Sequence, residues 1–189
     1  MNAPQPAPRP ATYQDVLEAP PHMVAEIVHG ALELHPRPAP RHAWASSRIG
    51  GRLGRAFDDD DDGAGPGGWI ILDEPELHLG GDVLVPDLAG WRRERMPSLP
   101  EGAWFELAPD WACEVLSPST RRLDLTDKRA IYAREGVGFL WFVDPDARTL
   151  EAFGLREGAW VLLGALAGEA AVRMAPFEAL EWPLGALWA

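Results

Sequence analysis

Short apolar segments separated by turn residues recur along most of this chain and predict a protein built mainly on β-strands. The clearest pair flanks the turn His29-Gly30, where the residues on both sides are mostly apolar or β-branched. This pattern is typical of a hairpin, and the turn at residues 80–82 predicts another. The predicted strands are residues 23–28, 31–35, 69–72, 76–79, 83–85, 111–116, 139–143, 149–153 and 160–163.

Three other segments have the features of helices. Thr12 is a suitable N-cap for one or two helical turns near the start of the chain. Residues 42–57 predict an amphipathic helix, and a third helix, capped by Asp124 or Thr126, is expected to run to about Glu135. The apolar stripe of the second helix consists of Trp44, Ile49, Leu53 and Phe57.

Residues 111–144 combine these elements as strand, loop, helix and strand. Together with the preceding hairpins, these residues predict an α/β (α+β) protein whose core is a mixed β-sheet flanked by helices. The fold is expected to begin with an N-terminal hairpin. The 189 residues suit a single domain, for which we expect residues 12–189. Residues 1–11 are rich in proline and alanine, and we expect them to form a disordered tail.

Two features indicate a cytoplasmic protein. The N-terminal segment has no apolar stretch of the kind found in secretory signals, and Cys113, the one cysteine, cannot form a disulfide within the chain. Cys113 lies in an apolar strand pattern, so we expect a buried thiol rather than a nucleophile. The apolar run at residues 159–168 has about half the length of a membrane-spanning helix, so we expect no membrane span.

The net charge of −12 argues against a protein that coats nucleic acid non-specifically, because such binding depends on neutralising phosphates. The excess of acid lies outside residues 111–135, which carry four acidic and five basic side chains. The acidic run at residues 58–62 is expected to be a solvated loop rather than a metal site. His42, at the start of the second predicted helix, is expected to be a cap or loop residue rather than a ligand.

Three carboxylates stand in segments that are otherwise apolar. Glu26 lies in the first arm of the predicted hairpin, and Glu114 interrupts a strand that would otherwise be wholly buried. Burying an ionised carboxylate is costly unless it is paired or binds a metal, so Glu114 is either paired with an arginine or a metal ligand. Asp87 follows an apolar strand directly and is either a turn former or a functional carboxylate.

Lys128 is the only lysine in a chain that has sixteen arginines. Lysine is a compact charge whose pKa changes readily on burial, whereas arginine is a fixed, planar charge. On the third predicted helix Lys128 shares a face with Ile131 and Tyr132, so its ammonium projects beside residues that pack on the sheet. We therefore expect Lys128 to have a role that arginine does not fill.

Three carboxylates that converge with one ammonium suit a hydrolase that uses a divalent metal ion to cleave phosphodiesters. Two carboxylates about 4 Å apart repel each other by roughly 4 kcal/mol at an effective dielectric constant near 20, so they cluster only around a cation. Hard oxygen ligands favour magnesium or manganese. The metal would polarise the phosphate and lower the pKa of a bound water, while the lysine would orient that water or stabilise the developing charge.

Two stretches of the sequence resemble a known group of nucleases. Pro86-Asp87, twenty-six further residues and then Glu114-x-Leu116 resemble the motif of the PD-(D/E)XK nuclease superfamily. The strings EVLSPSTRRLDLTDKRAIYAREGV and LWFVDP, which begin at Glu114 and Leu140, resemble the Uma-two family of restriction-endonuclease-like proteins. This resemblance extends from the hairpin of Glu26 to about Leu163.

The resemblance implies a restriction-endonuclease-like core with Asp87 and Glu114 as metal ligands, Glu26 as an accessory acid and Lys128 as the catalytic lysine. It also implies magnesium or manganese as the cofactor and nucleic acid, specifically DNA, as the substrate. One position departs from the superfamily pattern, because Leu116 replaces the usual lysine of the strand. In the Uma-two pattern the lysine comes from the following helix, as Lys128 does, and its long side chain can bring the charge to the same space.

Two other interpretations stay open, namely a catalytically silent nuclease-fold protein that acts as a binding or assembly module, and a purely structural ion-pair cluster. The presence of all four polar groups, with the only lysine among them, favours the enzyme. Cleavage of both DNA strands by a chain with one active site favours a homodimer.

Overall fold

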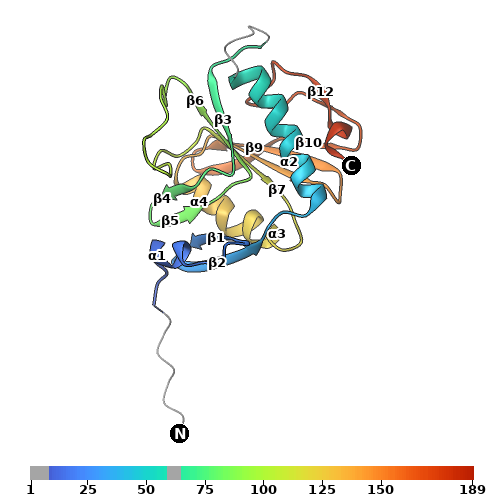
Figure 1. Ribbon diagram of the computed structural model, residues 1–189. Coiled ribbons are helices and arrows are strands. Elements are labelled where there is room, and N and C mark those ends of the chain that lie inside the picture. The colour runs from blue at the N-terminus through green and yellow to red at the C-terminus, as the bar shows by residue number, and fades with distance from the viewer. Residues whose placement is uncertain (1–8, 59–64) are drawn as a thin grey trace.

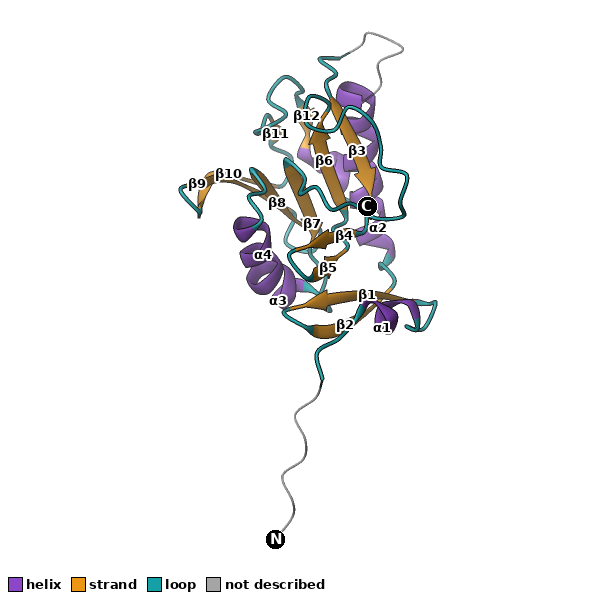
Figure 2. Ribbon diagram, turned by 90° about the vertical axis from the view of Figure 1, so that its left-hand side faces the viewer, coloured by secondary structure: helices purple, strands orange, loops and turns teal. Residues whose placement is uncertain are grey.

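The computed structural model describes residues 9–58 and 65–189, and most of its strands belong to two sheets (Figures 1 and 2). The larger sheet has six strands in the order β10-β9-β8-β7-β6-β3. They are β3 (Trp69–Asp73), β6 (Leu88–Arg92), β7 (Trp111–Val115), β8 (Phe139–Asp144), β9 (Thr149–Arg156) and β10 (Ala159–Ala167). β7 and β8 run parallel while the other neighbours are antiparallel, which confirms the predicted mixed sheet.

Both faces of this sheet are covered at β7. Strand alternation turns one set of β7 side chains toward α2 (Pro40–Leu53) and the C-terminal segment, and the other set toward the helix that follows β7. The first set is Trp111, Cys113 and Val115, and the second is Ala112 and Glu114. The thiol of Cys113 is buried, as predicted. Glu114 is the one carboxylate on β7, and it is held beneath a helix.

The smaller sheet joins two hairpins that are far apart in the sequence. Its strand order is β2-β1-β5-β4. The strands are β1 (Met23–Val28), β2 (Ala31–Pro36), β4 (Leu77–Leu79) and β5 (Asp82–Leu84). Both predicted hairpins are confirmed, and Ile27 of β1 pairs with Val83 of β5. This pairing places Glu26 beside Val85, whose backbone N–H donates to the Glu26 carboxylate at 2.7 Å.

The second predicted helix forms, but part of its predicted apolar stripe is wrong. α2 continues beyond Leu53 as a π-helical turn over Gly54–Asp58. The buried residues of α2 are His42, Ala45, Ile49 and Leu53. Trp44 is 41% exposed, because a spacing of five from Ile49 turns it away from the buried face.

The helix after β7 begins earlier than the sequence predicts. It consists of α3 (Arg121–Leu123), a π-helical turn (Asp124–Lys128) and α4 (Arg129–Arg134). Its N-cap is Thr120, so the prediction of Asp124 or Thr126 as the cap is wrong. Asp124 lies inside the helix and is buried. As a result, one more carboxylate faces the sheet than the sequence analysis anticipates.

The two ends of the chain complete the fold. α1 (Tyr13–Leu17) follows Thr12 as predicted. Near the C-terminus lie β11 (Ala171–Val172), β12 (Trp182–Pro183) and a 3-10 turn (Leu184–Leu187), which pack against α2. Of the predicted tail over residues 1–11, residues 1–8 lie outside the described residues, and so do residues 59–62 of the acidic run over residues 58–62. The described ends of both segments make contacts: the backbone N–H of Ala11 donates to the carbonyl oxygen of Gly30 at 2.7 Å, and Asp58 pairs with Arg93 at 2.8 Å. The single domain over residues 12–189 stays a prediction. In the part of the chain that is described, every helix is too short or too polar to cross a membrane.

Candidate active site

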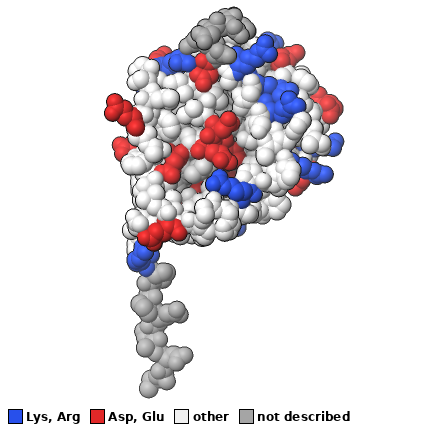
Figure 3. Space-filling model, viewed as in Figure 1, with Lys and Arg blue, Asp and Glu red and all other residues white. Residues whose placement is uncertain are grey.

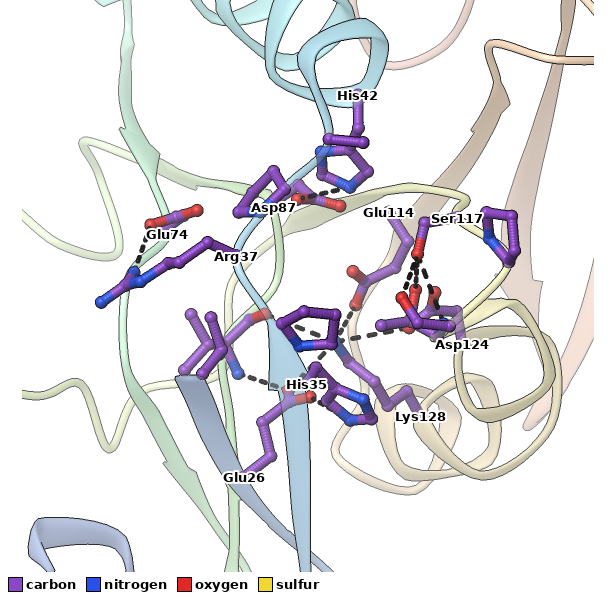
Figure 4. Close-up of a pocket in the computed structure, with 18 residues that line it drawn as sticks. Glu26, His35, Arg37, His42, Glu74, Asp87, Glu114, Ser117, Asp124 and Lys128 are labelled. Atoms are coloured by element: carbon purple, nitrogen blue, oxygen red, sulfur yellow. Dashed lines mark hydrogen bonds and ion pairs between the residues drawn. The ribbon is translucent and has the colours of Figure 1, made fainter. Parts of the chain in front are cut away.

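The charged residues predicted from the sequence line one cavity of about 230 Å³ (Figure 4). It lies where the smaller sheet, β7 and the helix after β7 meet. Glu26 comes from β1, Asp87 from the connection between β5 and β6, Glu114 from β7 and Lys128 from the helix. Residues separated by about a hundred positions in the sequence are thereby brought together.

Lys128 is buried among three carboxylates and is only 2% exposed. Its Nζ lies 2.8 Å from Glu114 Oε1, 3.0 Å from Glu26 Oε1 and 3.6 Å from Asp124 Oδ1. It also lies 3.4 Å from the carbonyl oxygen of Val85. Burial lowers the pKa of Lys128, but the charges of Glu114 and Glu26 raise it more, so this pKa lies well above its ordinary value. The ammonium is therefore charged at neutral pH.

Glu114 is paired with Lys128 and Tyr132, so the alternative of an ion pair with an arginine is wrong. The Tyr132 hydroxyl donates to Glu114 Oε1 at 2.6 Å, and the ammonium of Lys128 contacts the same oxygen. Burial raises the pKa of Glu114, and the charge of Lys128 opposes that rise. The carboxylates of Asp124 and Asp87 raise it further, so the pKa of Glu114 lies well above its usual range.

Glu26 is held on several sides. Its Oε1 accepts from the backbone N–H of Val85 and lies 3.0 Å from the Lys128 ammonium. Its Oε2 lies 3.6 Å from Nε2 of His35 on the neighbouring strand β2. With 3% of its surface exposed, Glu26 has little freedom to move. It therefore sets the position of the ammonium from the side of the smaller sheet.

Asp87 lines the same cavity, but its two contacts are separate from those of Lys128. Its Oδ2 accepts from the backbone N–H of Val115 at 2.7 Å, next to Glu114 in the chain. Its Oδ1 lies 3.1 Å from Nε2 of His42. Among the described residues, no ion pair joins Asp87 to Lys128. Asp87 and Lys128 thus flank Glu114 without touching each other.

His42 is neither a cap nor a loop residue, so that expectation is wrong. It lies in the first turn of α2, where its buried side chain points toward Asp87 (Figure 4). Burial lowers the pKa of His42, but the hydrogen bond and charge of Asp87 raise it above its ordinary value of 6.5. The sequence did contain a signal, because His42 has helical spacing to Ala45 and Ile49 on the buried stripe.

Asp124 is a site residue, although the sequence predicts it only as a candidate helix cap. It lies four positions before Lys128 on the same helix, a spacing that brings acidic and basic side chains together. Burial raises its pKa, Lys128 and a hydrogen bond with Thr120 lower it, and the net effect is a raised pKa. That spacing is the signal that would have identified Asp124.

Negative charge exceeds positive charge in this cavity. Five carboxylates line it, against one ammonium, one guanidinium and two imidazoles, and acidic side chains also gather near the centre of the face seen in Figure 3. The carboxylates are those of Glu26, Glu74, Asp87, Glu114 and Asp124, and the basic groups are those of Lys128, Arg37, His35 and His42. Within residues 9–58 and 65–189, however, no group of three or more His, Cys, Asp or Glu side chains is arranged to hold a metal ion.

The fold is similar to that of a solved nuclease-like protein. A crystal structure described as a "putative nuclease belonging to DUF820 from Anabaena variabilis ATCC 29413" superposes with a TM-score of 0.75 and 21% sequence identity. The match covers 95% of this chain and 98% of that chain. At this level of identity the likeness establishes the fold, and it confirms the predicted fold class. No curated protein matches the chain.

The family is established by a match along nearly the whole sequence. The model of the Uma2 family, described as "Putative restriction endonuclease", matches residues 10–185. That range contains every residue of the cavity described above. The chain therefore belongs to the Uma2 family.

Proposed function

We propose that this protein is a metal-dependent endonuclease that hydrolyses DNA phosphodiester bonds at the cavity of Glu114 and Lys128. The observation that carries the proposal is the convergence of carboxylates from separate elements on one cavity with the only lysine of the chain. The family description supports a nuclease. In this proposal Asp87 and Glu114 bind the metal, Glu26 is an accessory acid and Lys128 is the catalytic lysine.

Magnesium or manganese fits the donor chemistry of the cavity. Carboxylate oxygens are the ligands that these ions prefer. Burial raises the pKa of Glu114 and Asp124 and Lys128 only partly opposes that rise, so a divalent ion bound beside them would favour their charged forms. Two protein carboxylates suffice for magnesium, which keeps several waters and takes further oxygens from phosphates. A bound ion would supply Lewis acidity and a water of lowered pKa.

Lys128 acts in this proposal as a charge rather than as a base. Its raised pKa, which the charges of Glu114 and Glu26 cause against the effect of burial, keeps the ammonium protonated. A protonated lysine can donate hydrogen bonds to a phosphate oxygen or to the attacking water. The ammonium's contacts with the Val85 carbonyl at 3.4 Å and with Asp124 at 3.6 Å are the longest, so the Lys128 N–H groups that make them are the ones that can turn toward a substrate.

His42 positions Asp87 in the proposed site. Nε2 of His42 lies beside one carboxylate oxygen of Asp87 and the backbone N–H of Val115 donates to the other. Each oxygen keeps a further lone pair for a metal, because a carboxylate can accept about four hydrogen bonds. Carboxylates that bind metals are commonly held by such hydrogen bonds, which fix their orientation.

A catalytically silent binding or assembly module is the second candidate, and one observation favours it. The Lys128 ammonium fills the space between Glu26, Glu114 and Asp124, as in an ion cluster that only holds the fold together. Such a cluster needs no metal. The two candidates therefore differ in whether Asp87 and Glu114 bind a metal ion.

A homodimer formed through β10 is part of the proposal. β10 is an edge strand of the larger sheet, and Figure 2 shows β9 and β10 extending away from the body of the molecule. The strand exposes Val161, Leu162 and Leu163 by 45%, 52% and 39%. An exposed apolar edge strand readily pairs with a second chain.

Supercoiled plasmid DNA is the substrate that tests the activity. With magnesium or manganese, the wild-type protein is expected to convert it to open-circular or linear DNA. Asp87→Asn is expected to abolish this conversion, because the amide keeps the shape of the side chain but cannot replace a charged metal ligand. A parallel titration with metal, followed by tryptophan fluorescence, should respond in the wild type and much less in Asp87→Asn or Glu114→Gln.

Asp110→Asn is the matched control. The side chains of Asp110 and Asp87 are 16% and 15% exposed, and Asp110 likewise accepts from a backbone N–H and pairs with a basic side chain. It lies outside the cavity, so Asp110→Asn should cleave normally once folded. Equal cleavage by Asp87→Asn would overturn the role of Asp87. A folded wild type that binds no metal and cuts neither DNA nor RNA would favour the silent module.

A further inference from the structure

α2 carries a basic surface that is separate from the carboxylate cavity. Residues 40–57 contain four arginines and no Asp or Glu, in a chain whose net charge is −12. Arg48 and Arg55 are exposed and Arg52 is half-buried, and the three share one side of the helix beside its buried stripe. Figure 3 shows basic side chains gathered over α2 on the face where the acidic ones lie nearer the centre.

The same three arginines line an open groove of about 630 Å³ between α2 and the segment that contains β12. Its other lining residues include Ser47, Gly51 and Trp182. A Cβ atom at Gly51 would meet no other atom within 4 Å, so the floor of the groove is open. We name this feature the arginine groove, formed by Arg48, Arg52 and Arg55.

Aromatic rings orient two of the guanidinium groups. The guanidinium carbon of Arg48 lies 4.2 Å from the centre of the Trp44 ring, and that of Arg52 lies 5.4 Å from the Trp182 ring. Stacking uses the flat face of a guanidinium and leaves the N–H groups along its edge free to donate. Arg52 also donates to the carbonyl oxygen of Arg48 at 3.0 Å, which fixes its place in the row.

Positive charge in the arginine groove is not balanced within the described part of the chain. There, none of its three arginines forms an ion pair with a carboxylate. Burial and the charge of Arg48 together lower the pKa of Arg52, as expected for cations held side by side. A row of like charges of this kind attracts a ligand that carries several negative charges in a line.

The arginine groove lies along the helix that begins at the proposed active site. His42, in the first turn of α2, lines the carboxylate cavity. At 1.5 Å per residue, Arg48 lies about 9 Å and Arg55 about 20 Å further along the helix. One DNA strand carries a phosphate every 3.4 Å or so of helix axis, so the groove spans roughly three to six steps beyond the cavity.

We infer that the arginine groove binds the sugar-phosphate backbone of the DNA whose scissile bond lies in the carboxylate cavity. The position of that bond rests on the proposed nuclease function. Guanidinium contacts to phosphates fix the register of DNA but do not read its sequence. Elsewhere the surface is predominantly acidic and repels phosphates, so the groove also directs DNA to the face that carries the active site.

The test measures binding of a short DNA duplex by fluorescence anisotropy at several salt concentrations, with EDTA present so that no metal is available for cleavage. The double variant Arg48→Gln/Arg55→Gln removes two exposed charges and leaves the packing of Arg52 on Trp182 intact. Its plot of log affinity against log salt is expected to lose about two units of slope, equally for duplexes of different sequence. Arg156→Gln/Arg173→Gln removes two exposed arginines outside α2 and should leave the slope unchanged.

Two results would overturn the inference: an unchanged slope in the double variant, or binding to vesicles of anionic phospholipid without binding to the duplex. Failure of the proposed function would look different. A wild type that binds the duplex through Arg48 and Arg55 but cuts no plasmid supports the groove and refutes the nuclease. If instead the wild type cuts plasmid while the double variant keeps the wild-type salt slope, the nuclease is supported and the arginine groove is refuted.

Discussion

At the scale of single residues, removal of the Lys128 ammonium would leave Glu26, Glu114 and Asp124 buried without the cation that they share. Breaking a buried ion pair by removing one partner costs about 3–5 kcal/mol. We expect Lys128→Met to lower the free energy of unfolding by that amount at neutral pH, because methionine fills similar space without the charge. Urea unfolding followed by tryptophan fluorescence measures the loss.

The loss should depend on pH in a definite direction. Burial already raises the pKa of Glu114 and Asp124, and the charge of Lys128 opposes that rise. In Lys128→Met both pKa values should rise further. A carboxyl group whose pKa is raised in the folded state binds protons more tightly there than in the unfolded state. Its protonation therefore stabilises the fold in full below the ordinary pKa, which is 4.5 for Glu, and this stabilisation is lost as pH rises through the pKa of the folded state.

The free energy of unfolding that Lys128→Met loses relative to the wild type should therefore be smallest in mild acid and should grow toward neutral pH. Arg41→Met is the control, because Arg41 is 71% exposed and pairs with Asp146 at the surface. It should change stability little at any pH, since exposed ion pairs contribute little. A deficit that is the same at acid and neutral pH would refute the idea that Lys128 compensates buried carboxylates.

The sequence indicated some site residues and hid others for a physical reason. Glu26, Glu114 and Lys128 were identified because each is a charge in an apolar segment, where burial has a high cost without a partner. Asp124 fits a helix cap in the sequence because Asp and Thr are common at helix starts. His42 fits a cap or loop residue because its partner, Asp87, is distant in the sequence. The helical spacing of His42 to Ala45 and of Asp124 to Lys128 becomes informative only once the buried face of each helix is known.

At the scale of elements, α2 and the connection before β6 meet through His42 and Asp87, whose side-chain atoms are 3.1 Å apart. Burial alone lowers the pKa of His42, and the hydrogen bond and charge of Asp87 reverse that effect. In Asp87→Asn we expect the pKa of His42 to fall below 6.5, because the burial remains and the charge does not. NMR titration of the imidazole ring protons measures the change.

The wild-type protein provides the comparison, with a His42 pKa above 6.5. A raised histidine pKa stabilises the folded state in full below the ordinary pKa, and this stabilisation is lost as pH rises through the pKa of the folded state. Asp87→Asn should therefore lose stability mainly in mild acid. The same His42 pKa in both proteins would mean that Asp87 does not hold the imidazole in solution.

Element types were predictable, whereas some boundaries were not. The hairpin of β1 and β2 and the alternation in β7 follow from a period of two, and both are confirmed. The start of α3 was missed because residues 117–126 contain several good caps, and local sequence does not choose among them. The burial of Asp124 beside Lys128 accompanies the start at Arg121. Burial of this kind depends on tertiary packing, which the local sequence does not show.

At the scale of the whole molecule, the fold class was predictable from the family-like strings, but the arrangement of the sheets was not. The pairing of Ile27 with Val83 joins hairpins that no sequence period relates. Without that pairing, Glu26 would not reach Lys128. The candidate site therefore depends on long-range assembly, although its members are visible one by one in the sequence.

Simultaneous cleavage of both strands of a duplex favours two active sites held together, so the proposed dimer has a consequence that plasmid DNA reveals. A dimer joined at β10 should produce linear plasmid early, together with open circles, whereas independent monomers should produce open circles first. Leu162 is 52% exposed on β10, and Leu162→Lys places a charge on that edge without touching the cavity. We expect sedimentation to show a wild-type dimer and a monomeric Leu162→Lys variant.

The variant separates assembly from chemistry, because Leu162 is not among the residues that line the cavity. Nicking by Leu162→Lys should persist while early linear product is lost, since each monomer keeps a complete site but no longer brings a second one to the opposite strand. Ala159→Lys is a matched control, which adds the same charge to an exposed position at the start of β10. A wild type that sediments as a monomer while making linear product early would contradict the β10 dimer, because its two cuts would then need no second chain.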